Sequence, residues 1–267
     1  MYKIGWFSTG RGAGSRALLT AIMENIQQGA INAELSFVFC NRAPGQAKET
    51  DVFFELVNHY SIPLVYVSSQ RFKTTQGITT MSDQQRLEYD RQIMEQLQGF
   101  EADICVLAGY MLIVGAEMCT RYTMINLHPA TPTGPAGTWR EVIWQLIDSK
   151  ASETGVMMHL VTPELDKGPP VTYCAFPIRG EPYDEHWEEI AGVSVNEIMA
   201  QHGENNRLFQ LIRQEGLKRE QPLIVATLKA FSDGKVRIEN GNVVDSSGQL
   251  IKAYSLTQEI EAMIQAT

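Results

Sequence analysis

Short apolar runs alternate with longer amphipathic stretches through the first two thirds of the chain. Runs rich in β-branched and aromatic residues predict five strands, at residues 3–8, 35–40, 64–67, 103–108 and 123–127. Stretches with apolar residues at helical spacing predict helices at residues 15–27, 46–60, 83–98 and 138–147. Strands joined through helices of this length predict a parallel sheet with right-handed crossovers. The expected fold class is therefore α/β, with a doubly wound, mostly parallel and Rossmann-like sheet.

The pattern changes in the last third of the chain. Residues 155–161 and 171–176 predict a hairpin, and residues 206–231 predict a long C-terminal helix. Residues 235–254 contain Asn-Gly and Ser-Gly pairs and predict short strands joined by tight turns. The acidic and aromatic residues 179–205 predict no regular element.

Composition limits the classes of partner. The chain has 267 residues, of which 44% are hydrophobic and 20% charged, as in an ordinary globular protein. A net charge of −9 argues against a nucleic-acid partner, and no apolar run is long enough to cross a membrane. The N-terminus enters a strand directly, without the pattern of a signal peptide, so we expect a cytoplasmic location.

Cysteine and histidine spacing favours neither disulfides nor metal. Cys40, Cys105, Cys119 and Cys174 lie far apart, mostly in apolar runs and without a C-x-x-C motif, which predicts free thiols. The histidines show no H-x-H or H-x-x-x-H spacing, so no metal site is expected.

A glycine-rich turn joins the first strand to the first helix. It consists of Gly10, Arg11, Gly12, Ala13 and Gly14. Backbone amides at such a helix start favour a phosphate. Position 15 is Ser, so the G-x-G-x-x-G dinucleotide motif is incomplete. Arg42 follows the second strand, which keeps open an alternative in which the turn binds NADP.

The fifth strand ends with two polar side chains on one face. Asn126 and His128 lie two residues apart, and ligands of parallel sheets bind beyond the carboxyl ends of the strands. An Asn amide and an imidazole donate hydrogen bonds to an oxyanion, and a carboxylate such as Asp166 accepts a proton. These residue types suit acyl transfer without a nucleophilic side chain, although a strand-end Asn and His also cap turns. His159 lies in an apolar strand and is more typical of the core or of a supporting role.

Several motifs together resemble the folate-dependent formyltransferases. They are Asn126-Leu127-His128-Pro129, Thr154-Gly155, the stretch His159 to Pro169 containing Leu165-Asp166-Lys167-Gly168-Pro169, Leu107 to Met111, and Ser8 to Gly12. The similarity covers residues 1–178. It implies an enzyme that moves a formyl group from 10-formyltetrahydrofolate to the amine of glycinamide ribonucleotide in purine biosynthesis, without a metal.

The resemblance also implies roles for particular residues. Asn126, His128 and Asp166 match the family's catalytic trio, and the glycine-rich turn matches its substrate phosphate site. The residues that match the family's folate site are Arg86, Met111, Leu112, Ile113, Val114, Val161 and Glu164. Alternatives are transfer to another amine, hydrolysis of formyltetrahydrofolate, and an NADP-dependent reductase. The sequence leaves open whether the chain forms a homodimer.

The chain departs from the family pattern at three places. Residues 130–135 replace the usual Ser-Leu-Leu-Pro, Leu112 replaces an arginine, and a segment near 180–205 is inserted. We expect a single domain over residues 1–267. It would combine a phosphate-binding half (1–100), a catalytic and folate-binding half (101–178) and a C-terminal extension (179–267).

Overall fold

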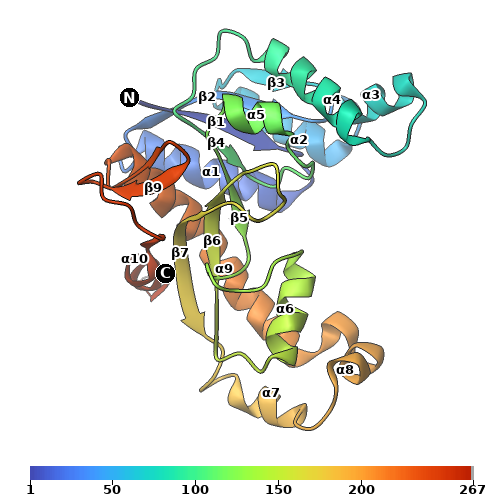
Figure 1. The fold of residues 1–267 in the computed structure, drawn as a ribbon, viewed down its shortest axis with the longest axis vertical. Helices are drawn as coiled ribbons and strands as arrows, with labels where there is room; N and C mark the ends of the chain where they lie inside the picture. Colours follow the sequence, from blue (N-terminus) through green and yellow to red (C-terminus); the bar gives the residue numbers. More distant parts are fainter. Residues whose placement is uncertain (266–267) are drawn as a thin grey trace.

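The computed structural model describes residues 1–265, and a twisted sheet forms its centre (Figure 1). Within this range the large sheet has eight strands in the order β10-β7-β6-β5-β4-β1-β2-β3. Its strands are β1 (Tyr2–Ser8), β2 (Ala33–Cys40), β3 (Leu64–Tyr66), β4 (Ile104–Leu107), β5 (Met124–His128), β6 (Glu153–Leu160), β7 (Pro170–Pro177) and β10 (Tyr254–Ser255). A separate hairpin is formed by β8 (Val236–Glu239) and β9 (Asn242–Asp245).

The first five strands pair in parallel, whereas β6 is antiparallel to both β5 and β7. The helices are α1 (Ala13–Gln27), α2 (Lys48–His59), α3 (Ser69–Gln76), α4 (Asp83–Gln96), α5 (Ala116–Arg121), α6 (Trp139–Asp148), α7 (Asp184–Glu189), α8 (Val195–Gln201), α9 (Arg207–Ser232) and α10 (Thr257–Gln265), with a short 3₁₀ helix at Gly203–Asn205. The mostly parallel α/β architecture is confirmed. No helix of residues 1–265 is long and apolar enough to span a bilayer.

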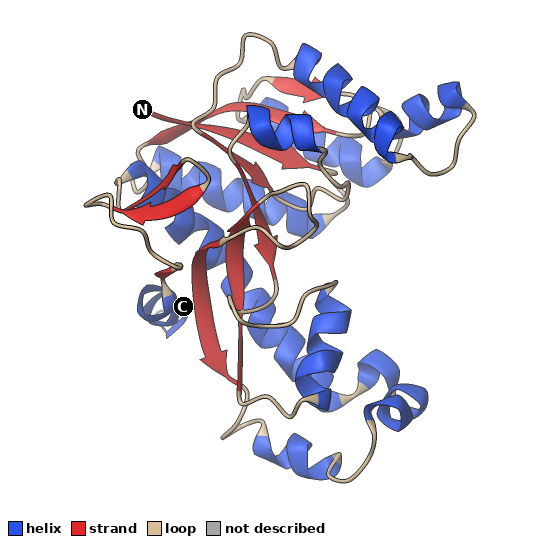
Figure 2. Cartoon of the chain, in the orientation of Figure 1, coloured by secondary structure: helices blue, strands red, loops and turns tan. Residues whose placement is uncertain are grey.

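Helices cover both faces of the sheet, and each face has its own hydrophobic cluster (Figure 2). Ile4 and Trp6 of β1 belong to the first cluster, with α1, α2 and α9, while Phe7 belongs to the second, with α4 and α5. Neighbouring strand residues point to opposite faces, so one apolar strand serves both layers. Cys40, Cys105 and Cys174 are buried, Cys119 is half-buried, and all four are free thiols, as expected.

A third cluster gives the C-terminal segment the structure that its pattern did not predict. Tyr183, Trp187 and Ile198 of residues 180–205 pack with apolar residues of α6 and of the first turns of α9. The Trp187 indole Nε1–H also donates to the Ile178 carbonyl, 2.6 Å away. In Figure 1 the helices α6, α7 and α8 form a lobe beyond the end of the sheet.

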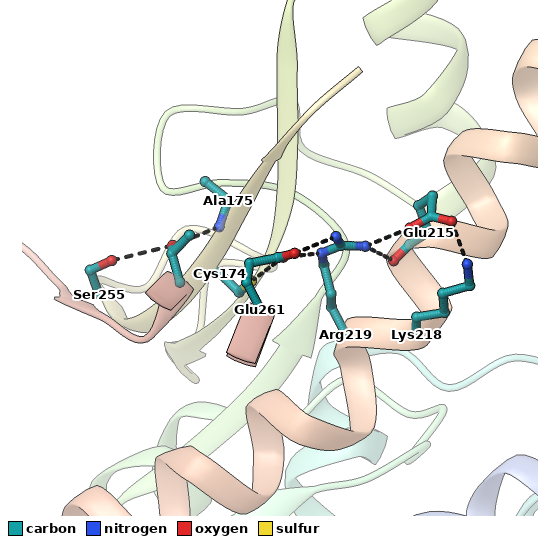
Figure 3. A network of polar contacts seen from close by, with 8 residues as sticks. Cys174, Ala175, Glu215, Lys218, Arg219, Ser255 and Glu261 are labelled. Atoms are coloured by element: carbon teal, nitrogen blue, oxygen red, sulfur yellow. Dashed lines mark hydrogen bonds and ion pairs between the residues drawn. The ribbon is translucent and has the colours of Figure 1, made fainter. Parts of the chain in front are cut away.

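An ion-pair network centred on the buried Arg219 holds the last helix (Figure 3). Arg219 of α9 pairs with Glu261 of α10 at 2.6 Å and with Glu215 at 2.9 Å, and its guanidinium lies 4.1 Å from the centroid of the Phe176 ring. Because the Arg219 side chain is buried, removing a carboxylate partner would leave its positive charge poorly compensated. The network therefore joins α9, α10 and β7.

Candidate active site

The candidate site is centred on the carboxyl end of β5, where the parallel strands end. Asn126 is half-buried and the side chain of His128 is almost fully buried, 3% exposed. In the antiparallel ladder Asn126 lies directly opposite His159 of β6, so these side chains share one face of the sheet. The rings of His128 and His159 meet edge to face, with their centroids 5.9 Å apart.

His159 orients the Asn126 amide. The Nδ1–H of His159 donates to the Leu160 carbonyl at 2.8 Å, because a carbonyl oxygen only accepts. Its Nε2 then accepts from Asn126 Nδ2 at 3.3 Å. Burial lowers the pKa of His159, which favours this neutral form. One amide proton of Asn126 is thereby engaged, and its second proton stays available for an oxyanion.

Asp166 reaches the site on the loop between β6 and β7. Its backbone is left-handed, with φ of 56°. Two residues later, a Cβ on Gly168 would lie 1.7 Å from the Leu160 carbonyl oxygen, so this loop closes only with glycine there. The structure brings Asp166 Oδ1 to 3.7 Å from His159 Nε2. Asp166 therefore lies beside His159 of β6, and its carboxylate is also within 4.8 Å of a ring nitrogen of His128.

The unusual loop 130–137 holds the other catalytic candidate. His128 Nε2 donates to the Pro135 carbonyl at 3.1 Å. The loop is held in turn by α6, since Gln145 Nε2 donates to the Ala136 carbonyl at 3.1 Å and Thr138 forms a capping box with Glu141. With Nε2 engaged, Nδ1 is the nitrogen of His128 that remains for a substrate.

A cavity of about 290 Å³ opens beside Asn126, His159 and Asp166. Its lining is mostly apolar. The remaining lining residues are Leu107, Tyr110, Met111, Leu112, Ile113, Val114, Thr138, Val161, Thr162 and Leu165. Residues 111–114 and Val161, which were expected in the folate site, therefore line the same cavity as Asn126, His159 and Asp166.

Two expected folate residues lie outside the cavity lining. Glu164 is exposed and pairs with Lys167 at 3.1 Å, because the turn directs its side chain to solvent. Arg86 donates from Nη1 to the Ile113 carbonyl at 3.1 Å, so it contacts the back of the cavity wall. Conversely, Leu107, Tyr110 and Thr138 line the cavity but had not been assigned to the folate site. Their position beside recognised motifs was the available signal.

The glycine-rich turn adjoins the same cavity. Thr9 Oγ1 accepts from the Met111 amide at 3.1 Å, and the Thr9 amide donates to the Gly109 carbonyl. Helix α1 begins at Ala13 without a side-chain cap or an acidic residue in its first turn. Arg42 donates to Thr50 Oγ1, which lies 3.2 Å from the Gly10 carbonyl, so Arg42 supports the turn.

His128, His159 and Asp166 also offer three ligand atoms within 4.8 Å of one another, a set that a cation could use. However, the His159 Nε2 lone pair already accepts the Asn126 amide proton. The arrangement suits the stabilisation of a developing oxyanion, with a carboxylate nearby to accept a proton. An α/β sheet with an apolar cavity and an Asn-His-Asp group at its strand ends defines a group-transfer enzyme of Rossmann-like fold.

The comparisons give that class a family. The model of the formyl transferase family matches residues 11–190, which is more than half of the chain. The chain belongs to the formyl transferase family and is an enzyme of formyl transfer.

Individual relatives have low sequence identity to the chain, and their names agree with the formyl transferase family. Phosphoribosylglycinamide formyltransferase of Escherichia coli (strain K12) is 26% identical over 174 residues, 64% of this chain and 70% of the relative. Formyltetrahydrofolate deformylase of Haemophilus influenzae is 27% identical over 143 residues, 53% of this chain and 44% of the relative. The solved phosphoribosylglycinamide formyltransferase of Coxiella burnetii superposes with a TM-score of 0.65 at 19% identity, covering 95% of this chain and 98% of its own. At that identity the match supports the fold.

Proposed function

We propose that the protein transfers the formyl group of 10-formyltetrahydrofolate to the amine of glycinamide ribonucleotide, a step of purine biosynthesis. The observation that carries this proposal is the cavity in which Asn126, His159 and Asp166 meet the apolar wall 110–114. The flat face of the donor's pterin ring suits such a wall, and the formyl group of the donor would then face Asn126, His159 and Asp166. The relatives named phosphoribosylglycinamide formyltransferase support the choice of acceptor.

The mechanism needs no covalent enzyme intermediate. The acceptor amine attacks the formyl carbon, and the carbonyl oxygen becomes an oxyanion. The free amide proton of Asn126 and Nδ1–H of protonated His128 donate to that oxyanion. Asp166 accepts the proton of the attacking amine and returns one to the departing folate nitrogen, directly or through water. Attack forms the new C–N bond, and the oxyanion then collapses to a carbonyl as the bond from the formyl carbon to the folate nitrogen breaks.

The division of labour along the chain forms part of the proposal. Residues 1–100 contribute the glycine-rich turn, whose backbone amides at the start of α1 would bind the acceptor's phosphate. Residues 101–178 contribute the donor cavity and the catalytic group. Residues 179–267 contribute α7, α8 and α9, which pack with α6 and with Ala130 of the loop that follows His128.

Hydrolysis of the same donor is the second candidate. It is favoured by the similarity to a formyltetrahydrofolate deformylase, and its chemistry differs only in using water as the acceptor. In either reaction Asn126 and His128 keep their roles.

An acceptor screen tests the proposal. The protein is given 10-formyltetrahydrofolate with glycinamide ribonucleotide, with other amines, and alone, while tetrahydrofolate, formylated product and formate are measured. The proposal expects formylated glycinamide ribonucleotide, and the formation of formate from donor alone would favour hydrolysis. His128→Ala and Asp166→Asn should abolish turnover, while His186→Ala, far from the cavity in α7, should not. Equal rates for the unaltered protein and His128→Ala would overturn the assignment.

A further inference from the structure

Two side chains on one face of α4 form hydrogen bonds with the backbone of the cavity wall. Arg86 and Asp90 lie four residues apart and therefore point the same way from the helix. Arg86 Nη1 donates to the Ile113 carbonyl at 3.1 Å, and Asp90 Oδ2 accepts from the Gly115 amide at 2.6 Å. The two side chains thus bind a carbonyl and an amide of one short backbone segment.

Asp90 occupies a place that is costly for a carboxylate. Only 2% of the residue is exposed, and burial raises its pKa to about 6. The groups that act on it electrostatically include Arg86 on its own helix, Glu117 and Cys119 on α5, and Tyr110. A buried carboxylate is retained at such a site only where it makes a strong hydrogen bond, here the one from the Gly115 amide.

The contact with Asp90 also explains why position 115 is a glycine. A Cβ on Gly115 would lie 2.7 Å from Asp90 Oδ2 and 3.3 Å from Leu87 Cδ2. Its φ of −81° is open to any residue, so the close approach of Asp90, and not the backbone conformation, excludes a side chain.

The gripped segment is the cavity wall itself. Met111, Leu112, Ile113 and Val114 all line the cavity. The Met111 amide is fixed at one end by Thr9 Oγ1, and the Gly115 amide is fixed at the other by Asp90. This stretch belongs to no helix or strand, so side chains replace the regular backbone hydrogen bonds that would otherwise hold it.

We propose that Asp90, together with Arg86, is a positioning residue for the formyl donor: it clamps Ile113–Gly115 and thereby holds the wall against which the folate packs. This inference rests on the proposed use of a folate donor. Asp90 does not line the cavity, so its effect is on donor binding and not on the chemical step.

Steady-state kinetics of three variants test the clamp. Asp90→Ala removes the acceptor of the Gly115 amide and should raise the KM for 10-formyltetrahydrofolate about tenfold, with kcat changed less than about threefold. Asp90→Asn retains an oxygen that accepts the same hydrogen bond and should restore a KM close to that of the unaltered protein. Glu95→Ala removes an exposed carboxylate from the same helix and serves as the matched control. The KM for the acceptor should stay constant throughout.

A double-mutant cycle supplies an independent check. Gly115→Ala should raise the donor KM because the new methyl group displaces the wall from Asp90. In the Asp90→Ala background the methyl group has room, so Gly115→Ala should add little. Additive effects of the two substitutions would contradict the clamp.

Hydrogen exchange separates this inference from the proposed function. In the ligand-free protein, backbone amides of residues 109–118 should exchange faster in Asp90→Ala and unchanged in Asp90→Asn. If the unaltered protein turns over no 10-formyltetrahydrofolate, the proposed function fails whatever the exchange shows. If it is active, but Asp90→Ala changes neither the donor KM nor this exchange, the clamp is refuted while the function stands.

Discussion

At the scale of single residues, the candidate site depends on which N–H groups are not already engaged in hydrogen bonds within the protein. Asn126 donates one amide proton to His159 Nε2, and His128 donates its Nε2–H to the Pro135 carbonyl. The Asn126 amide keeps one free proton for the substrate, and His128 keeps Nδ1, which donates once the imidazole is protonated. Both side chains are oriented before any ligand arrives. Such preorganised donors are usually the largest contribution to stabilising an oxyanion.

Asn126→Ala should therefore lower kcat by roughly a hundredfold or more, which is the usual cost of one oxyanion donor. The KM for either substrate should change much less, because the donor acts mainly in the transition state. Measurement of kcat beside a thermal unfolding curve checks this, with the exposed Asn58→Ala in α2 as control. Retention of more than about a third of the rate would remove Asn126 from the catalytic group.

The buried carboxyl group of Asp90 should make the free energy of unfolding depend on pH. Its pKa is raised from 3.8 to about 6, so between about pH 4 and pH 6 the folded state binds this proton more tightly than the unfolded state. Its contribution to stability is therefore largest at low pH and is lost as pH rises through 6, by about 3 kcal/mol in total. Asp90→Asn lacks this loss. Urea unfolding should show the variant gaining on the unaltered protein from pH 4 to pH 7, and a constant difference would contradict the raised pKa.

At the scale of elements, the antiparallel strand β6 organises the site. It places His159 opposite Asn126 and leads into the loop that carries Asp166. The hairpin was predicted from its two apolar runs, but its pairing with β5 was not, because the register between two apolar strands depends on contacts that are distant in the sequence. Helices α3 and α5, of eight and six residues, were missed because such short elements carry little periodic signal.

Gly168→Ala tests the loop after β6. The added Cβ has no room beside the Leu160 carbonyl, so the loop must shift and carry Asp166 with it. We expect a loss of about 2 to 4 kcal/mol in the free energy of unfolding and a large drop in kcat. Gly216→Ala in α9 meets nothing within 4 Å and should stabilise by about 0.5 to 1 kcal/mol. Equal stability of the two variants would show that the loop is not tightly closed.

At the scale of the whole molecule, α9 joins the sheet to the lobe. Leu208 and Phe209 near its start belong to the third cluster, whereas Leu223 and Ile224 further along belong to the first. Ala130, which directly follows Pro129 of the Asn126–Pro129 motif, is fully buried in the third cluster. Residues 180–205 thus pack into the same cluster as the start of α9 and as Ala130 of the loop that holds His128.

This continuity predicts that residues 1–267 unfold as one cooperative unit, as a single domain should. The tryptophans separate the parts: Trp6 lies in the first cluster, and Trp139, Trp144 and Trp187 lie in or against the third. In Trp6→Phe, fluorescence reports on the third cluster alone, while far-ultraviolet circular dichroism reports on the whole chain. Coincident urea transitions are expected, and an earlier fluorescence transition would make the lobe a separate unit.

The sequence by itself determined the sheet and the motif at its edge. Alternating apolar runs predicted the parallel strands and the hairpin, and the spacing of Asn126 and His128 placed them at a strand end, because both signals are local in the chain. Tertiary structure alone decided that Asp166 lies against His159, that Arg86 and Asp90 hold the cavity wall from behind, and that the acidic segment 180–205 has a core. Those features depend on contacts between residues far apart in the sequence, which no local periodicity encodes.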